Sequence, residues 1–191
     1  MRKKLMRAAI SVLVNRGYAN FTTAEVARVA GTSRGALSHH FESTQVFILA
    51  AIDDLYASLL RRAERRAVEA DLTGDLLAPI VADARDFLLG TGFMSIYNTL
   101  IEMRNSGASD DVDDIGVKYR VPIEQIWSTY LMNRGVSEAE AEECVWTIFS
   151  VVRGLSIRRV LNCEEQQIER TLDFTLDIIK ARLAKYSVGQ T

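Results

Sequence analysis

The sequence predicts an all-α protein of about nine helices: an amino-terminal three-helix helix-turn-helix domain followed by a larger helical domain. The 191 residues include only two prolines and 11 glycines, which favours long helices over a turn-rich β fold. Hydrophobic residues make up 48% of the chain and recur at helical spacing. Residues 22–41, TTAEVARVAGTSRGALSHHF, have the pattern of two short helices around a glycine. We place the boundary between the two domains at 1–52 and 53–191.

The segment 22–41 carries the strongest local signal. Thr22 and Glu25 stand at capping-box spacing, so each side chain can satisfy an amide at the start of a helix. Gly31 follows where a left-handed residue can end that helix. Ala27, Gly31 and Leu37 form A-x3-G-x5-L, the spacing of a helix-turn-helix with a sharp turn.

Motifs on both sides of this segment match one family. They are Arg16-Gly17-Tyr18, Phe21-Thr22-Thr23, Val26-Ala27, Ala30-Gly31, Ser33-Arg34-Gly35-Ala36-Leu37, His40-Phe41 and Ser43. With them, residues 5–52 resemble the amino-terminal DNA-binding domain of TetR-family transcriptional regulators. The resemblance implies a ligand-responsive, sequence-specific regulator, by family default a repressor, that binds double-stranded DNA at a palindromic operator as a homodimer. It implies DNA contacts from Lys3, Thr22, Thr23, Ser33, Arg34, Gly35, Ser38, His39, His40 and Thr44.

Among these residues, Arg34 is the best candidate to read guanine, because a guanidinium can bond both acceptors of that base. Two positions depart from the family pattern. Ser38 stands where members commonly have a tyrosine that touches phosphate, and Thr44 or Gln45 replaces a common lysine. Fewer phosphate contacts predict a shallower salt dependence of binding, with base readout less affected.

The charge is distributed unevenly along the chain. Residues 1–50 hold seven basic and two acidic side chains, a net of +5, whereas the remaining 141 residues have a net charge of −7. The overall charge of −2 therefore combines a basic amino-terminal segment, which we call the head, with an acidic remainder, which we call the body. This favours a phosphate partner for the head alone, although basic residues near an amino terminus can also be a simple solvated face.

The body reads as a series of helices. We expect them at Thr44–Ala70, Thr73–Leu89, Phe93–Arg104, a segment that ends at Asn133, Ser137–Leu161 and Glu164–Tyr186. Ser137 and Glu140 predict a second capping box. Arg61, Arg62, Arg65 and Arg66 form a run that we interpret as a solvated helix face, because Glu64 and Glu69 interrupt it.

The last two helices are apolar on two faces, which leaves one face exposed in a monomer. A two-fold dimer that pairs both helices with their mates in a four-helix bundle covers it. Gly154 indicates a close helix crossing or a kink. The predicted interface residues are Val151, Leu155, Arg158, Leu172, Thr175 and Ile179.

The body also predicts a binding site for an unknown small-molecule effector, which by family resemblance lies among its helices. An aromatic lining suits an apolar or aromatic molecule, although aromatic residues at helical spacing are more often core. The candidates are Phe87, Phe93, Tyr97, Glu102, Trp127, Tyr130, Trp146, Phe149 and Arg153. A buried Arg153 requires a partner, either an internal carboxylate such as Glu102 or an anionic ligand.

Other function classes lack support in the sequence. His39 and His40 are the only histidines, and on a helix they point about 100° apart, so they cannot serve one metal or one nucleophile together. We expect no catalysis, no cofactor and no metal. The longest apolar run, Val46–Ile52, is too short to cross a membrane, and reduced cysteines suit a cytoplasmic protein. Two rivals remain: a ligand-independent architectural DNA-binding protein, and a dimeric small-molecule-binding protein with a degenerate DNA head.

Overall fold

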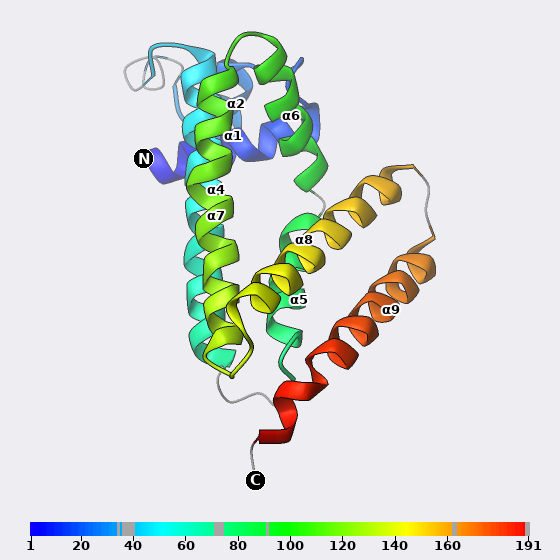
Figure 1. Cartoon of the computed structure of the whole chain (residues 1–191). Coiled ribbons are helices and arrows are strands. Elements are labelled where there is room, and N and C mark those ends of the chain that lie inside the picture. Colours follow the sequence, from blue (N-terminus) through cyan, green and yellow to red (C-terminus); the bar gives the residue numbers. More distant parts are fainter. Residues whose placement is uncertain (34, 36–40, 71–74, 91, 162–163, 190–191) are drawn as a thin grey trace. The chain divides into compact units, whose positions relative to one another are not determined.

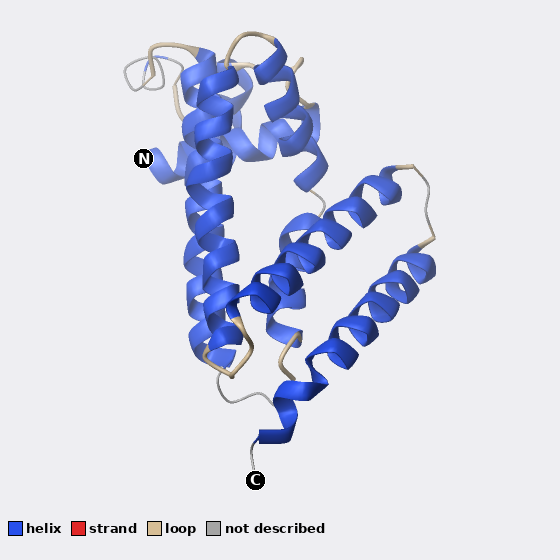
Figure 2. Cartoon of the chain, in the orientation of Figure 1, coloured by secondary structure: helices blue, strands red, loops and turns tan. Residues whose placement is uncertain are grey.

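The computed structural model describes residues 1–33, 35, 41–70, 75–90, 92–161 and 164–189, and helices are the only regular secondary structure in these ranges (Figure 1, Figure 2). The predicted all-α class is therefore confirmed. The helices are α1 (Arg2–Arg16), α2 (Thr23–Ala30), α4 (Thr44–Glu69), α5 (Ala78–Leu88), α6 (Phe93–Asn105), α7 (Ser109–Met132), α8 (Glu138–Val160) and α9 (Glu165–Leu183), with a 3₁₀ turn, η2 (Ala184–Gly189).

The chain divides into two compact units. One contains Met1–Leu59 and Thr91–Tyr119, and the other contains Leu60–Gly90 and Arg120–Thr191. Helices α4 and α7 each contribute to both units. The first unit contains α6 and the first part of α7, which sequence patterns had not attached to the head. The predicted domain boundary at residues 52 and 53 stays a prediction.

The core of the first unit forms where α1 and α2 meet the start of α4. Phe47 is fully buried, and its ring centroid lies 6.0 Å from that of Phe21 and 4.5 Å from that of Phe41. Leu5 and Leu13, which lie eight residues apart on the same face of α1, are also fully buried. Removing a buried aromatic ring costs about 3–5 kcal/mol, so this cluster contributes strongly to the stability of the first unit.

The second unit packs α5 against α8, and α8 against α9, which lie side by side in Figure 1. Its most deeply buried large side chain is Trp127 of α7. The predicted capping box at the start of α8 is wrong in its detail. Ser137 is the residue before the helix, but its hydroxyl lies 3.2 Å from the Glu140 carboxylate, and it makes no side-chain bond to a cap amide.

The arginine run on α4 is the main correction to the predicted helix faces. Arg61 and Arg65 are exposed as expected. Arg62 and Arg66 are not simply solvated, because both donate hydrogen bonds to the buried carboxylate of Asp83 on α5. A pattern of charges along one helix does not reveal a partner that another helix supplies 17 or 21 residues later.

Candidate DNA-binding and effector sites

The ends of α2 have the geometry that a helix-turn-helix requires. The Thr22 hydroxyl accepts a hydrogen bond from the Glu25 amide at 3.2 Å, which caps the helix. Gly31 ends it in the left-handed conformation, with φ 58° and ψ 48°. The amides of Gly31 and Thr32 donate to the carbonyls of Arg28 and Ala27 at 3.1 and 2.9 Å, the bonding pattern of a Schellman motif. The predicted stop at Gly31 is confirmed.

The amino-terminal end of α4 offers a second polar feature of the head. Ser43 caps it, since its hydroxyl accepts from the Val46 amide at 3.1 Å. Thr44 is the first residue of the helix, and its side chain is exposed. A helix amino terminus with exposed hydroxyl and amide donors suits a phosphate oxygen.

Not every basic side chain of the head is available to an anion. Arg28 donates two hydrogen bonds to the Glu25 carboxylate, at 2.9 and 2.8 Å, and Arg16 lies 3.8 Å from the same group. These bonds, above all those of Arg28, lower the pKa of Glu25. The capping-box prediction thus holds for Thr22 but not for the carboxylate, which binds arginine. Lys3 of α1 is exposed and its side chain forms no ion pair with any described residue.

The other predicted DNA contacts fall into two groups. Thr22, Ser33 and Gly35 are exposed, and Thr23 is half-buried. Arg34, Ser38, His39 and His40 lie outside the described residues, so their roles stay predictions.

In the second unit, α7 and α8 bring charged and aromatic side chains together, and we call Arg120, Glu124, Trp146 and Arg153 the α7–α8 cluster. Arg120 donates to Glu124 at 2.7 Å, and its guanidinium carbon lies 5.8 Å from the Trp146 ring centroid. Burial raises the pKa of Glu124, although the charges of Arg120 and Arg153 oppose this. Arg153 is half-buried, and its side chain forms no ion pair with any described residue. The charge of Arg153 therefore acts on Glu124. Glu102, one of the alternatives suggested as its partner, is exposed on α6, and the partner of Arg153 stays a prediction.

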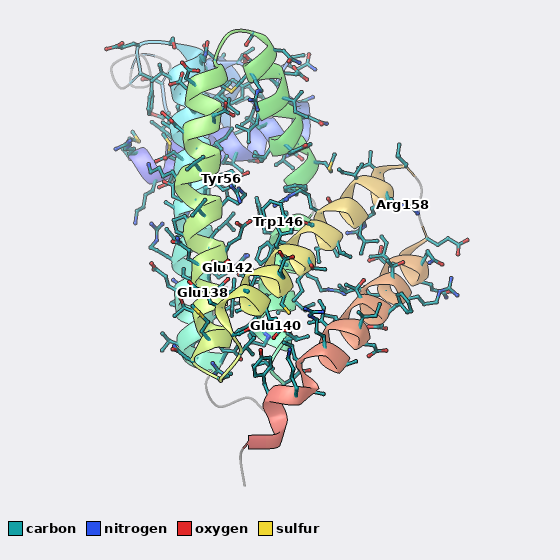
Figure 3. All side chains as sticks on the ribbon, in the orientation of Figure 1. Tyr56, Glu138, Glu140, Glu142, Trp146 and Arg158 are labelled. Carbon is teal, nitrogen blue, oxygen red and sulfur yellow. The ribbon has the colours of Figure 1, made fainter. Side chains whose placement is uncertain are left out.

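Trp146 is the member of the cluster that can be followed in Figure 3. It continues a row along α8 that begins with Glu138 and Glu142, whereas Glu140 lies on the side of α9. Trp146 is 56% exposed, which leaves its ring accessible, whereas Phe149 is buried.

Two further candidates from α7 lie in the core. Trp127 is fully buried, its ring centroid lies 5.5 Å from that of Tyr130, and its Nε1 donates to Asp83 Oδ2 at 3.1 Å. The guanidinium carbon of Arg134 lies 3.6 Å from the Tyr130 ring centroid. The Tyr130 hydroxyl is buried and has no hydrogen-bond partner among the described residues. Phe87 of α5 is half-buried.

The remaining effector candidates belong to the first unit. Phe93 is buried and stacks on the half-buried Tyr97 of α6, with ring centroids 5.7 Å apart. The assignment of all nine residues to one effector site stays a prediction.

The predicted dimer residues divide by burial. Leu155, Leu172 and Ile179 are buried within the chain itself, so they would add little new contact area to the predicted interface. Val151 and Thr175 are half-buried, and Arg158 is exposed near the end of α8 (Figure 3). Besides Trp146, the large apolar residues exposed on the two helices, which the interface prediction did not include, are Ile157, Val160, Phe174 and Ile178. An added Cβ at Gly154 meets no atom within 4 Å, so this glycine marks no close crossing with another described helix of the chain.

Comparison with known proteins decides the family. Residues 5–51 match the family described as bacterial regulatory proteins, tetR family. Over 96% of its length the chain is 33% identical to the HTH-type transcriptional regulator CymR of Pseudomonas putida, of which the match covers 91%. The chain belongs to the TetR family. Its members are DNA-binding transcriptional regulators and not enzymes, so the regulator prediction is confirmed at that level.

Solved structures agree on the fold of this TetR-family chain. A putative TetR-family transcriptional regulator from Mesorhizobium loti has a TM-score of 0.75 at 13% identity, over 94% of this chain and 95% of that one. A putative transcriptional regulator from Saccharomonospora viridis, in complex with choline, has a TM-score of 0.72 at 18% identity, over 94% and 95%. At these identities the likeness shows the fold alone.

Two residues of this TetR-family regulator were not selected from the sequence although the structure makes them central. Asp83 is the acceptor for three side chains, and Glu124 is the carboxylate of the α7–α8 cluster. Only Glu124 had a local signal, since Arg120 precedes it at i, i+4 spacing. Among the described helices none is both long and apolar enough to cross a bilayer.

Proposed function

We propose that this regulator is a ligand-responsive repressor that binds a palindromic operator as a homodimer and releases it when an apolar or aromatic small molecule binds. The observation that carries the proposal is the helix-turn-helix geometry at Thr22 and Gly31 in a chain that matches a TetR-family regulator over nearly its whole length. Operator DNA is the partner, so we place its action in the cytoplasm.

The predicted DNA contacts of the head divide into base readers and phosphate contacts. Arg34, Ser38 and His39 project into the major groove, where Arg34 reads guanine. Thr22, Thr23, Thr44 and Lys3 bind phosphates and set the register on the duplex. The exposed hydroxyl of Thr44 at a helix amino terminus supports this assignment, as does the exposed ammonium of Lys3, which forms no ion pair with any residue that the structure describes.

The outer face of α8 and α9 supports the homodimer. Phe174 and Ile178 on α9 are 68% and 55% exposed, and Val160 on α8 is 62% exposed. Exposed apolar side chains gathered on two neighbouring helices mark an interface. A two-fold dimer with recognition helices about 34–36 Å apart spans one turn of DNA.

The α7–α8 cluster supports an effector site in the second unit. An accessible indole, a half-buried guanidinium and a half-buried carboxylate provide an aromatic surface with polar groups that orient a ligand. The Saccharomonospora viridis protein in complex with choline shows that this fold can be bound by a small organic molecule. We infer that Trp127, Trp146, Phe149 and Arg153 line the site.

Selection of random duplexes on the purified protein, followed by sequencing, tests the proposal. We expect a two-fold symmetric motif whose half-sites lie about one helical turn apart. Arg34→Ala should abolish enrichment, whereas Arg170→Ala, an exposed arginine on α9, should leave it unchanged. Enrichment without symmetry favours an architectural protein, and no enrichment favours a small-molecule-binding protein with a degenerate head. Either result contradicts the proposed function.

A further inference from the structure

The carboxylate of Asp83 joins three helices of the second unit. It lies on α5 and is only 3% exposed. Its Oδ1 accepts from Arg62 Nε at 3.0 Å and from Arg66 Nη1 at 3.3 Å, both on α4. Its Oδ2 accepts from Trp127 Nε1 of α7 at 3.1 Å. Arg62 also donates to the backbone carbonyl of Asp83 at 3.2 Å, so the arginine holds both the side chain and the main chain of α5.

The chemistry of this arrangement is directional. A buried carboxylate requires partners, and here two guanidinium groups and one indole supply them. Arg66 is shared, because it also donates to the exposed Asp86. Apolar packing between helices tolerates small rotations, whereas hydrogen bonds to a planar carboxylate lose strength when a donor turns away. Each oxygen accepts from a different helix: Oδ1 accepts from side chains of α4, and Oδ2 accepts from a side chain of α7.

We propose that Asp83 is a positioning residue that couples the indole of Trp127 to the carboxyl-terminal half of α4. When the indole moves, its bond to Oδ2 changes, the carboxylate turns, and the bonds from Arg62 and Arg66 to Oδ1 change with it. The inference rests on the proposed function, since it concerns how the effector site that includes Trp127 reaches α4. It names Asp83 as the residue that links Trp127 to Arg62 and Arg66, and all of these contacts lie within the second unit.

The test uses the two directions of the coupling in the intact protein. Trp127→Phe keeps an aromatic ring but removes the indole N–H, and hydrogen exchange then reports on the amides of residues 60–69. We expect their exchange to rise by about fivefold, the effect of one lost hydrogen bond. Trp146→Phe is the matched control, because it replaces the other tryptophan, which makes no bond to Asp83.

The reverse direction starts from α4. In the Trp146→Phe background Trp127 is the only tryptophan, so its fluorescence reports on the indole alone. Arg62→Met should shift the emission of Trp127, whereas Arg61→Met, at an exposed neighbouring position, should not. A substitution that only loosens the structure around itself would not produce both responses, the change in exchange on α4 and the change in emission from α7.

Asp83→Asn decides whether the carboxylate carries the effect. The amide keeps one acceptor oxygen and presents a donor to the other partner, so it cannot bond both helices as the carboxylate does. In this background Trp127→Phe should no longer change exchange in residues 60–69. A full response that persists in Asp83→Asn, or no response to Trp127→Phe in the native chain, overturns the inference.

Operator binding is a separate measurement on the same variants. A native protein that selects no operator contradicts the proposed function but not the coupling, which the exchange and fluorescence results decide. A native protein that selects an operator, with no exchange response to Trp127→Phe, contradicts the coupling but not the proposed function.

Discussion

Phe174 provides the sharpest test of the proposed dimer. A phenylalanine side chain has about 200 Å² of surface, and Phe174 leaves 68% of its surface exposed on α9, or about 140 Å² on that scale. A two-fold dimer that covers both copies buries about 280 Å², which at about 25 cal/mol per Å² stabilises the dimer by about 7 kcal/mol. Coverage of only half the area gives about 3.5 kcal/mol.

Phe174→Ala should therefore weaken dimerisation by at least about a hundredfold, since each factor of ten corresponds to about 1.4 kcal/mol. Sedimentation equilibrium over a range of protein concentrations measures the dimer dissociation constant. Val68→Ala is the control, because Val68 on α4 is 76% exposed yet does not belong to the α8–α9 face. A Phe174→Ala protein whose dissociation constant changes less than about threefold, about 0.7 kcal/mol, would refute the reasoning.

Three other predictions concern charge and backbone. The Glu140 carboxylate accepts hydrogen bonds from Lys185 and Tyr186, which lower its pKa from an ordinary 4.5 to about 2. The resulting stabilisation of the folded state is complete above about pH 4.5 and is lost as the pH falls toward 2. Glu140→Gln should lower the melting temperature at pH 7 and flatten its fall over that range; an unchanged pH profile would contradict the assignment. Gly31→Ala should lower the free energy of unfolding in urea by about 1–2 kcal/mol, because φ at this position is 58°. The nearest atom to the added Cβ lies 3.6 Å away in ordinary contact, so only the backbone is strained. No loss of stability would argue against a left-handed Gly31. Lys3→Ala should reduce the salt slope of operator binding by about 0.9, whereas Arg28→Ala should leave it nearly unchanged because Glu25 already pairs with that arginine; equal slopes for both variants would count against the phosphate role of Lys3.

Local sequence patterns predicted the helices well where the determining contacts lie within a few residues. Thr22 caps α2 through an amide three residues away, and Gly31 ends it through carbonyls three and four residues back. Such contacts depend on spacing alone, so the sequence shows them directly. Even here the partner of Glu25 was missed, because Arg28 competes with the cap amide for the same carboxylate.

The sites of the body were harder to predict because they depend on which helices meet. Arg62 and Arg66 looked like solvated charges, and nothing within α4 indicates Asp83 as their partner. For the same reason the sequence does not indicate that the charge of Arg153 acts on the pKa of Glu124. Leu172 and Ile179 were assigned to the dimer because α9 is apolar on two faces. The structure buries them inside the chain and leaves Phe174 and Ile178 outside, a choice that periodicity alone cannot make.

The energetics of Asp83 bear on the proposed shift of the regulator between two states. Hydrogen bonds to a charged group contribute about 1.5–3 kcal/mol each, and this buried carboxylate accepts three from side chains on two helices. Moving a two-state equilibrium from 1:99 to 99:1 requires about 5.5 kcal/mol of differential binding. Loss of two or three of these bonds is therefore of the same size as the whole switch. An effector that displaces the Trp127 indole needs no contact with α4 to favour a different position of that helix. On the proposed coupling, such an effector binds the displaced state more tightly by roughly the free energy that the Asp83 carboxylate loses, so the specificity of the proposed response depends on the indole of Trp127.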